Sequence, residues 1–494
     1  MLKFVRYSSN SVSRKKVSII GSGPSGFYTA YHLLNKSQEP LHVTIWEKLP
    51  IPFGLSRFGV APDHPEVKNC EDTFTKCAEE QLSNHSKHKF EFIGGVEIGD
   101  EIKLKQLLNK QDAVVLSYGC SGDRKLGILG EEDTSGVFSS REFVNWYNGH
   151  PNFALQPKFT KFDWSKVRKV GIIGNGNVAL DIARVFISNR VDDIWKSTDI
   201  SPIALECLKK APIENVKIIG RRDFLHSKFT NKELRELWEL EKYGIHGQIS
   251  NDYFRADIFD SSKLDRAFNR RVEMCSEYLK PFEERTKKNY RKVKPLELTP
   301  DGIYKKWELD YLKSPLKINK DDTGHLKSLV LSQNVVTEDN KIIKDEAKNN
   351  VEYQMDVLIT SLGYAGKPMS EFSQLGIKFE RDHLSNKEGR VLNVQNQIYP
   401  KMYTSGWIQK GSQGVIASTM MNAFDVADKV LADLSFLKET SSSKGIDVSL
   451  IKHTTWKDWE ILNRKELELG KLVNKKRLKY LTTEEMYKNV TEED

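Results

Sequence analysis

Short apolar runs, glycine-rich turns and helical patterns alternate near the N-terminus. Residues 17–20 form a mostly apolar run with β-branched side chains, which is typical of a buried strand. A turn with three glycines follows at residues 21–26, and residues 27–34 carry apolar side chains at helical spacing. A second apolar run, residues 43–46, ends at Glu47. This order predicts a parallel strand–helix–strand unit.

The same order returns in the middle of the chain. Residues 169–173 form an apolar run, residues 174–179 form a turn with the sequence Gly-Asn-Gly-Asn-Val-Ala, and residues 180–187 continue at helical spacing. The next apolar run, residues 216–219, comes later than in the first unit, which predicts an inserted segment around residues 189–212. A second strand–helix–strand unit is therefore predicted.

The three glycines of the first turn have the spacing of a dinucleotide-binding fingerprint. Gly21 permits a tight turn, Gly23 lets a pyrophosphate approach the backbone, and Gly26 lets the helix pack closely on the strand. The pyrophosphate then lies at the helix N-terminus. Glu47, at the end of the next strand, is placed to accept hydrogen bonds from ribose hydroxyls. The first unit therefore predicts an FAD-type site.

The second unit differs at two points that bear on the cofactor. Ala179 replaces the third glycine, which widens the contact between helix and strand slightly. Where the first unit carries its acid, the second carries Arg221 and Arg222. Two guanidiniums suit a 2′-phosphate, because their planar donors match its oxygens and their charge pairs with it. The alternative is two solvated arginines in a turn. The second unit thus predicts an NADPH-type site.

Two further apolar runs predict the domain organisation. Residues 113–119 and 356–363 both end in glycine and mark where the chain crosses between domains. The predicted fold class is α/β, with two dinucleotide-binding domains built on largely parallel sheets and the NADP domain inserted into the FAD domain. The predicted bounds are 15–119 and 371–494 for the FAD-binding domain and 120–370 for the NADP-binding domain, in which residues 338–354 form a hairpin or loop.

The composition narrows the classes of function. The chain has 494 residues, and 76 Lys and Arg against 68 Asp and Glu leave a formal charge of +8. A hydrophobic content of 38% is enough to bury full cores, which excludes wholesale disorder. No run approaches about 18 uncharged apolar residues, so no membrane-spanning helix is predicted. The small positive excess is spread among many acids and does not favour a nucleic-acid-binding protein, which stays as an alternative.

The five cysteines are scattered along the chain, at Cys70, Cys77, Cys120, Cys207 and Cys275. No two have CxxC spacing, which argues against a zinc ribbon and against a flavoenzyme that reduces disulfides through a vicinal dithiol. They also lack the clustering expected of a glutamate-synthase-type flavin subunit with iron–sulfur centres. An odd, scattered set suits a reducing compartment. No metal site is predicted.

Residues 1–14 have the composition of a targeting segment. They are basic and rich in serine, and no acid occurs before Glu39. This is typical of a mitochondrial presequence, whereas a secretory signal needs an apolar run that is missing here. The alternative is a short, disordered basic tail. We predict a mitochondrial protein.

Six segments carry a resemblance to a known family. Residues 52–68 read Pro-Phe-Gly-Leu-Ser-Arg-Phe-Gly-Val-Ala-Pro-Asp-His-Pro-Glu-Val-Lys, and the others are residues 174–184, 220–222, 232–236, 405–411 and 414–420. In this order they resemble the mitochondrial adrenodoxin reductase family, the NADPH–ferredoxin reductases, and its fungal branch in particular. The resemblance implies an FAD-containing, NADPH-dependent ferredoxin reductase that serves iron–sulfur cluster, haem or steroid-type monooxygenase pathways.

The resemblance also implies which residues contact each cofactor. The FAD contacts are Ser25, Glu47, Leu55, Val96, Trp407, Gly414, Val415 and Ile416. The NADP contacts are Asn175, Gly176, Asn177, Val178, Arg221, Arg222, Glu233 and Gly414. Ser25 stands where the family commonly has Ala, and no loss of function is expected from it. Glu233 has an alternative role because residues 230–233 fit a capping box, and Trp407 has an alternative role in core packing.

A histidine and an acid are singled out as a catalytic pair. In the family, the histidine of the 52–68 segment lies near the flavin and faces the acid of the second unit; here these are His64 and Asp181. Such a pair could orient the nicotinamide or relay a proton. The alternative is a rigid surface loop, because His64 lies between Pro62 and Pro65.

The partner implied by the resemblance is an acidic [2Fe–2S] ferredoxin. In the family it docks on a basic surface of the NADP domain, and Arg235, Arg266 and Arg270 match that surface. The alternative is an ordinary solvated helix face. The resemblance further implies a monomer in the mitochondrial matrix, with peripheral contact to the inner membrane.

Overall fold

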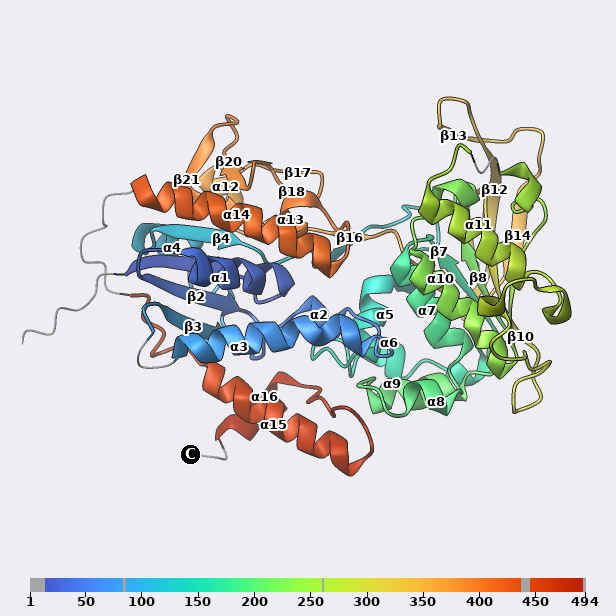
Figure 1. The fold of residues 1–494 in the computed structure, drawn as a ribbon, viewed down its shortest axis with the longest axis horizontal. Helices are drawn as coiled ribbons and strands as arrows, with labels where there is room; N and C mark the ends of the chain where they lie inside the picture. The colour runs from blue at the N-terminus through green and yellow to red at the C-terminus, as the bar shows by residue number, and fades with distance from the viewer. Residues whose placement is uncertain (1–13, 83–85, 260–261, 437–444, 492–494) are drawn as a thin grey trace, which may run out of the picture.

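The computed structural model describes residues 14–82, 86–259, 262–436 and 445–491. It consists of two α/β bodies side by side (Figure 1). The outer domain is built around a seven-stranded sheet, whose strands come from residues 15–116 and 386–404. The inner domain is built around a six-stranded sheet, whose strands come from residues 137–360. The predicted α/β class, with one domain inserted into the other, is confirmed.

The outer sheet has the strand order β19–β20–β21–β4–β1–β2–β3. Its strands are β1 (Lys15–Ile20), β2 (Leu41–Glu47), β3 (Lys89–Gly94), β4 (Ala113–Leu116), β19 (Asn386–Lys387), β20 (Arg390–Leu392) and β21 (Ile398–Thr404). Pairing is parallel from β21 to β3 and antiparallel for β19, β20 and β21. The predicted runs at residues 17–20 and 43–46 thus lie in two neighbouring parallel strands.

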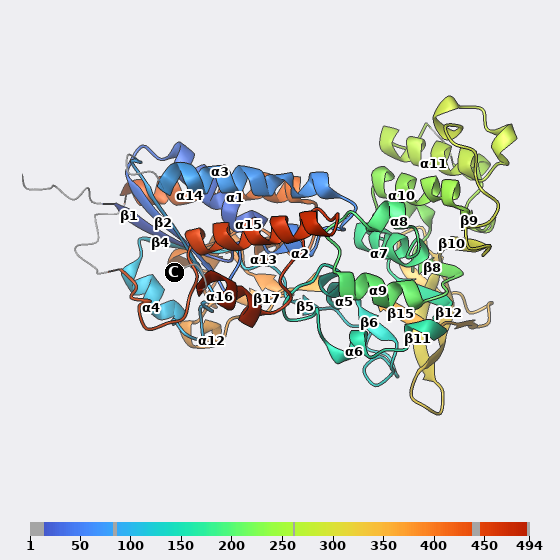
Figure 2. The ribbon, with the colours of Figure 1, turned by 90° about the horizontal axis from the view of Figure 1, so that it is seen from below.

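Helices cover both faces of the outer sheet (Figures 1 and 2). Because side chains alternate along a strand, β1 sends Val17 and Ile19 into one apolar cluster and Ile20 into another. The helices are α1 (Pro24–Lys36), α2 (Leu55–Phe58), α3 (Cys70–Leu82), α4 (Leu104–Lys110), α12 (Phe372–Leu375), α13 (Trp407–Lys410), α14 (Ile416–Phe436), α15 (Trp456–Leu472) and α16 (Thr483–Thr491). Of these, α1 packs along α14, so the two ends of the chain share one core.

The inner sheet has the strand order β6–β15–β7–β8–β10–β9, and all its pairs are parallel. The strands are β6 (Val137–Ser139), β7 (Lys169–Ile173), β8 (Asn215–Ile219), β9 (Ile245–Ile249), β10 (Lys305–Asp310) and β15 (Val357–Thr360). The helices are α5 (Ser140–Tyr147), α6 (Pro157–Thr160), α7 (Asn177–Ile187), α8 (Asp192–Trp195), α9 (Pro202–Lys210), α10 (Asn231–Trp238) and α11 (Arg266–Tyr278). The predicted insertion around 189–212 is confirmed, since α8 and α9 occupy it.

A small antiparallel sheet accompanies the inner domain. It consists of β11 (Lys313–Lys320), β12 (Leu326–Val336), β13 (Ile342–Lys344) and β14 (Val351–Gln354), so residues 338–354 form hairpin strands, as predicted. The chain passes between the domains in β5 (Gly122–Asp123) and β16 (Tyr364–Ala365), which pair with each other. The remaining elements are the hairpin β17 (Phe379–Glu380) and β18 (His383–Leu384), and the 3₁₀ turns η1 (Pro65–Asn69), η2 (Trp164–Lys166), η3 (Phe224–His226), η4 (Glu239–Tyr243), η5 (Ala256–Ile258), η6 (Phe282–Glu284) and η7 (Lys288–Tyr290).

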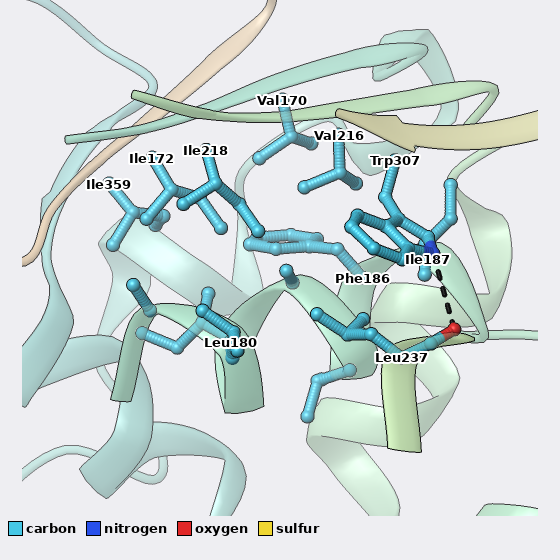
Figure 3. Close-up of a cluster of buried hydrophobic side chains, with 14 of the residues drawn as sticks. Val170, Ile172, Leu180, Phe186, Ile187, Val216, Ile218, Leu237, Trp307 and Ile359 are labelled. Atoms are coloured by element: carbon cyan, nitrogen blue, oxygen red, sulfur yellow. Dashed lines mark hydrogen bonds between the residues drawn. The ribbon is translucent and has the colours of Figure 1, made fainter. Parts of the chain in front are cut away.

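The inner core lies between the sheet and α7 (Figure 3). Phe186 of α7 is fully buried beneath the side chains of β7 and β8, among them Ile172 and Ile218. Trp307 of β10 packs beside them and donates from Nε1 to the Leu237 carbonyl at 3.2 Å, so its one polar atom is satisfied. Such burial stabilises the fold by about 1.5–3 kcal/mol per large apolar side chain.

No helix within the described residues combines the length and the apolar character needed to cross a lipid bilayer.

Candidate functional site

The first glycine-rich turn combines two packing constraints with one open position. Gly21 has φ +102°, and a Cβ there would lie 2.7 Å from the Ser117 carbonyl oxygen. A Cβ on Gly26 would lie 2.0 Å from the Gly21 carbonyl oxygen. A Cβ on Gly23 would meet nothing within 4 Å. Packing therefore requires the outer two glycines, while Gly23 leaves open space at the N-terminus of α1, where an anionic group is stabilised.

A cavity of about 830 Å³ opens at this turn. Residues from both ends of the chain and from the inner domain line it. Of the predicted cofactor contacts, Gly21, Gly23, Ser25, Glu47, Leu55, Val96, Trp407 and Ile416 line the cavity. The volume lies within the range of about 300–1,000 Å³ that is common for ligand sites.

Glu47 is held in the cavity wall by three donors. Its Oε2 accepts from the Ser22 backbone N–H at 3.0 Å and from the Ser22 hydroxyl at 2.7 Å, and its Oε1 accepts from the Leu49 N–H at 3.1 Å. These bonds fix the carboxylate at the end of β2. Each carboxylate oxygen can accept more than one hydrogen bond, so hydroxyls of a bound ligand can still be taken up.

Ser25 connects α1 to the turn that precedes Trp407. Its hydroxyl lies 2.6 Å from the Ser405 hydroxyl. The next residue, Gly406, has φ +75°, and a Cβ there would lie 2.6 Å from the Ser25 Cβ. The Gly406 N–H donates to Asn422 Oδ1 at 2.7 Å. Buried hydrogen bonds from two helices therefore place Trp407 at the cavity.

The residues at the start of α14 differ in whether they line the cavity. Ile416 lines it, whereas Gly414 and Val415 are not among the described residues that do. Gly414 has φ +84°, and the Val415 side chain is 52% exposed. Both therefore lie at the surface beside the cavity rather than in its wall.

Sequence patterns did not indicate several residues of the cavity wall. Among them are Tyr118, Cys120, Arg141, His150 and Tyr364. Burial raises the pKa of Cys120 to about 12 and lowers the pKa of His150 to about 3, so both side chains are neutral at pH 7. Neutral side chains at these two positions suit an uncharged ring system. No motif marks these residues, because they come from loops, a helix and the short strand β16, which only the fold brings together.

The second glycine-rich turn repeats the geometry of the first. Gly174 has φ +123°, and a Cβ there would lie 2.2 Å from the Ser361 carbonyl oxygen. Gly176 again has nothing within 4 Å of a Cβ position, and Ala179 is fully buried in the helix–strand contact. Asn177 Oδ1 accepts from the Thr230 N–H at 2.8 Å, which fixes the side chain at the start of α7.

Arg221 and Arg222 follow β8, the parallel neighbour of β7. Because parallel strands end at the same edge of a sheet, they lie on the same side as the second turn. Arg221 is exposed, and the half-buried Arg222 has an Nε atom without a hydrogen-bond partner. Within the described part of the chain, no carboxylate pairs with either guanidinium. Both are therefore available to an anion.

His64 lies in an ion cluster between the two domains. It is 5% exposed, and its Nε2 lies 2.5 Å from Glu236 Oε2, whereas its Nδ1 lies 3.9 Å from Asp181 Oδ1. Arg184 Nη2 lies 3.1 Å from His64 Nε2 and donates to Asp181 Oδ1 at 2.8 Å. Although burial acts to lower the pKa of His64, the hydrogen bond to Glu236 raises it. His64 and Asp181 thus meet across the domains, with Arg184 between them.

Glu233 belongs to the same cluster. The Thr230 hydroxyl accepts from the Glu233 N–H at 3.4 Å, which caps α10. The Thr230 N–H donates to Asn177, so the Glu233 carboxylate does not complete a capping box. That carboxylate lies 3.4 Å from Arg184 Nη1 instead. Burial, and then the charge of Asp181, raise the pKa of Glu233 to about 8.

His64, Asp181 and Glu233 are residue types that bind metal ions, and their ligand atoms lie within 4.8 Å of one another. The Arg184 guanidinium lies among them and donates to Asp181. It supplies the positive charge that a metal ion would bring.

The predicted docking arginines are exposed on two neighbouring helices. Arg235 lies on α10, and Arg266 and Arg270 lie on α11, which packs against α10. Residues 288–294, part of a stretch from 257 to 295 that is dense in Lys and Arg, lie beside them. The cations of this segment, Lys288, Arg291, Lys292 and Lys294, are exposed and, among the described residues, have no carboxylate partner. Burial raises the pKa of Tyr290 in this segment to about 12, and the charge of Arg235 acts in the opposite direction.

Comparison with known proteins identifies the family. A model of the NAD(P)-binding Rossmann-like domain matches residues 19–83. The Saccharomyces cerevisiae protein named "Probable NADPH:adrenodoxin oxidoreductase, mitochondrial" is 65% identical over 98% of this chain and 98% of its own length. The human protein named "NADPH:adrenodoxin oxidoreductase, mitochondrial" is 34% identical over 98% of this chain and 93% of its own length.

The chain belongs to the NADPH:adrenodoxin oxidoreductase family. FprA from Mycobacterium tuberculosis, solved in complex with NADPH, has the same fold with a TM-score of 0.81 and 28% identity, over 97% of this chain and 100% of that chain. The predicted family is confirmed. Membership of the NADPH:adrenodoxin oxidoreductase family sets aside the dithiol reductase, glutamate-synthase-type and nucleic-acid-binding alternatives.

Proposed function

We propose that this protein transfers electrons from NADPH, through FAD, to an adrenodoxin-like [2Fe–2S] ferredoxin in the mitochondrion. The yeast and human relatives are named for the NADPH:adrenodoxin reaction, and FprA was solved with NADPH. The observation that carries the proposal is the pair of open glycines, Gly23 and Gly176, at two helix N-termini in separate domains. Glu47 accompanies the first, and Arg221 and Arg222, which pair with no carboxylate among the described residues, accompany the second.

The residues of the outer cavity fit FAD. The open position at Gly23 admits a pyrophosphate, Glu47 accepts from ribose hydroxyls, and the part of the wall formed by Trp407 and Tyr364 accommodates a flavin ring. When bound, FAD supplies a group that takes up two electrons as hydride and releases them singly to an iron–sulfur partner. The N-terminus of α14, near Ile416, favours negative charge in that region.

The inner domain selects and places NADPH. The backbone amides at the start of α7, next to Gly176, favour the pyrophosphate. Arg221 and Arg222 favour the 2′-phosphate that distinguishes NADPH from NADH. The cluster of His64, Arg184 and Asp181 joins the domains, so it fixes how the nucleotide of the inner domain faces the cavity of the outer one.

An acidic ferredoxin docks on the basic surface of α10 and α11. Arg235, Arg266 and Arg270 form its centre, and residues 288–294 extend it with four exposed cations. Opposite charge on the two partners steers their encounter and sets the association rate more than the final affinity.

An anaerobic titration tests the reaction. Purified protein is expected to show flavin absorption bands that NADPH bleaches, and NADPH-driven reduction of cytochrome c is expected only when ferredoxin is added. Bleaching without ferredoxin-dependent reduction of cytochrome c would leave an NADPH-oxidising flavoprotein with a different acceptor. A protein that purifies without flavin, and cannot be loaded with it, would overturn the proposal.

The mitochondrial location depends on a segment largely outside the described residues. Residues 1–14 are proposed as the presequence, and only residue 14 of them is described. Deleting residues 1–13 leaves β1 intact and should keep NADPH-to-dye activity while the protein stays in the cytosol. Import of the shortened chain at the normal rate would contradict the assignment. We also propose that the protein is a monomer in the mitochondrial matrix and contacts the inner membrane peripherally.

A further inference from the structure

The backbone of the turn that carries Arg221 and Arg222 is held at three successive carbonyls. Two of the donors are backbone N–H groups just after β10, and the third is a side-chain amide on β12, 113 positions from its acceptor. The bonds run from Lys313 N–H to the Gly220 carbonyl at 3.2 Å, from Asn334 Nδ2 to the Arg221 carbonyl at 3.1 Å, and from Leu312 N–H to the Arg222 carbonyl at 3.2 Å. With all three carbonyls bonded, the peptide planes of this turn cannot rotate freely.

Both polar atoms of the Asn334 side-chain amide take part in hydrogen bonds. The residue is 3% exposed, and its second Nδ2 hydrogen goes to the Ser314 hydroxyl at 2.8 Å. Its Oδ1 accepts from the Ser332 hydroxyl at 3.3 Å, and its backbone N–H donates to the Leu312 carbonyl at 2.7 Å. Rotating the amide by 180° would place its oxygen against the Arg221 carbonyl, so the network selects one orientation.

The small antiparallel sheet thereby reaches the coenzyme side of the inner domain. We propose that Asn334 is a positioning residue that supports the preference for NADPH over NADH. By holding the Arg221 peptide, it fixes the directions in which the two arginine side chains leave the turn, and so lets both reach one 2′-phosphate. The Arg221 side chain has no ion pair of its own among the described residues. Its direction therefore has to be fixed by its backbone. The inference rests on the proposed use of NADPH.

The chemistry requires an amide at this position. An Asp side chain has the same shape but offers only acceptors when ionised, so it would repel the Arg221 carbonyl and attract the guanidinium away from a phosphate. An Ala side chain leaves the carbonyl without its donor. Neither change touches the glycine turn or the cavity wall, so binding of the rest of the coenzyme should be unaffected.

The test uses the full-length, FAD-loaded protein with a neutral dye as electron acceptor. For Asn334→Ala, KM for NADPH should rise about tenfold. This is the effect expected when one hydrogen bond between an arginine and the 2′-phosphate is lost. The value of kcat should not change, and neither should the kinetics with NADH. Calorimetry supplies a readout without turnover: the Kd of adenosine 2′,5′-bisphosphate should rise by the same factor, and that of AMP should not. Equal losses for both coenzymes, or no loss for either, would overturn the proposal.

Asn319→Ala is the matched control. Asn319 lies on β11 of the same small sheet and bridges Ser328 and Glu352 with its amide at 3.1 and 3.2 Å. Its loss should leave the preference for NADPH over NADH unchanged. If Asn319→Ala reduces this preference as much as Asn334→Ala does, damage to the sheet is responsible and the positioning role is wrong.

Two further variants separate the possible failures. If Arg221→Ala/Arg222→Ala keeps the preference for NADPH, the proposed phosphate site itself is wrong. If that variant loses the preference and Asn334→Ala keeps it, only the role of Asn334 is wrong. When the arginines are already removed, Asn334→Ala should cause no further loss. If Asn334→Ala does not fold, Asn334→Asp replaces it in the same test, because Asp keeps the volume of the side chain. The result expected and the result that would overturn the proposal are then the same as for Asn334→Ala.

Discussion

Arg184 and Asp63 join the two domains through a buried ion pair. Arg184 Nη2, from α7 of the inner domain, donates to Oδ1 of Asp63 in the outer domain at 3.1 Å, and the Arg184 side chain is 3% exposed. Asp181, Glu233 and Glu236 also lie within ion-pair distance of the same guanidinium. Although burial acts to raise the pKa of Asp63, the charge of Arg184 lowers it. One buried cation thus holds several acids at the domain boundary.

Removing that cation should be costly. Arg184→Met leaves the buried carboxylate of Asp63 without its cationic partner and should lower the free energy of unfolding by about 3–5 kcal/mol. Arg190→Met is the control, because Arg190 pairs with Asp301 at 3.2 Å while a third of its side chain is exposed, and it should cost about 1 kcal/mol or less. Urea denaturation measures both. Similar losses in the two variants would show that Arg184 has no special role.

The raised pKa of Glu233 should make stability depend on pH. An unfolded Glu has a pKa of about 4.3, whereas that of Glu233 is raised to about 8. Between these values the folded protein keeps a proton that the unfolded chain has released, so this residue's contribution to stability falls as pH rises.

Glu233→Gln should remove that loss. The free energy of unfolding of this variant minus that of the original protein should increase by at least about 1.4 kcal/mol between pH 5 and pH 8. That increase is the equivalent of one pKa unit. Denaturant unfolding at pH 5, 6.5 and 8 measures the difference. Glu239→Gln, at an exposed residue directly after the same helix, should show no such trend. A difference that is constant with pH would contradict the buried, protonated state of Glu233.

Glu47 is expected to retain the flavin. Glu47→Ala removes the ribose acceptor and also the bonds to Ser22 and Leu49, so the protein should purify with less FAD and unfold at a lower temperature. Glu97→Ala is the control, because Glu97 also lines the cavity but is exposed. The flavin content, from the absorption ratio of flavin to protein, measures the effect. Full flavin content in Glu47→Ala would rule out the role.

Docking on the basic surface should depend on ionic strength. The Debye length falls from about 10 Å at 0.1 M to about 3 Å at 1 M salt. Changing Arg235, Arg266 and Arg270 to Gln should raise KM for ferredoxin several-fold and flatten its dependence on salt, while NADPH-to-dye activity stays unchanged. Changing Lys288, Lys292 and Lys294 to Gln should act in the same direction and less strongly.

A matched triple change tests whether the surface or the total charge matters. Lys105, Lys161 and Lys327 are exposed and belong to other parts of the chain than α10 and α11. Changing them to Gln removes the same charge and should leave the salt dependence as it was. If this control reduces ferredoxin turnover as much, the net charge of the protein is responsible. If no triple change alters the salt dependence, the ferredoxin docks elsewhere.

The sequence by itself determined the nucleotide-binding units, because their requirements are local. A tight turn needs a glycine at positive φ, and a helix packed on a strand needs a small residue; Gly21, Gly26 and Gly174 meet these conditions within a few residues of their strands. The same holds for the alternation that places Val17 and Ile19 on one face of the outer sheet. These features could therefore be predicted, and the two apolar runs that end in glycine, residues 113–119 and 356–363, predicted the inserted domain.

Only the tertiary structure decided which distant residues meet. His64 has Glu236 as its nearest partner and Arg184 beside it, although sequence analysis paired it with Asp181 alone. Asn334 reaches the Arg221 turn from another sheet. The physical reason is that hydrogen bonds and ion pairs depend on distances of about 3 Å between groups, and such distances between residues far apart in the chain follow from how helices and sheets pack, which no local pattern records.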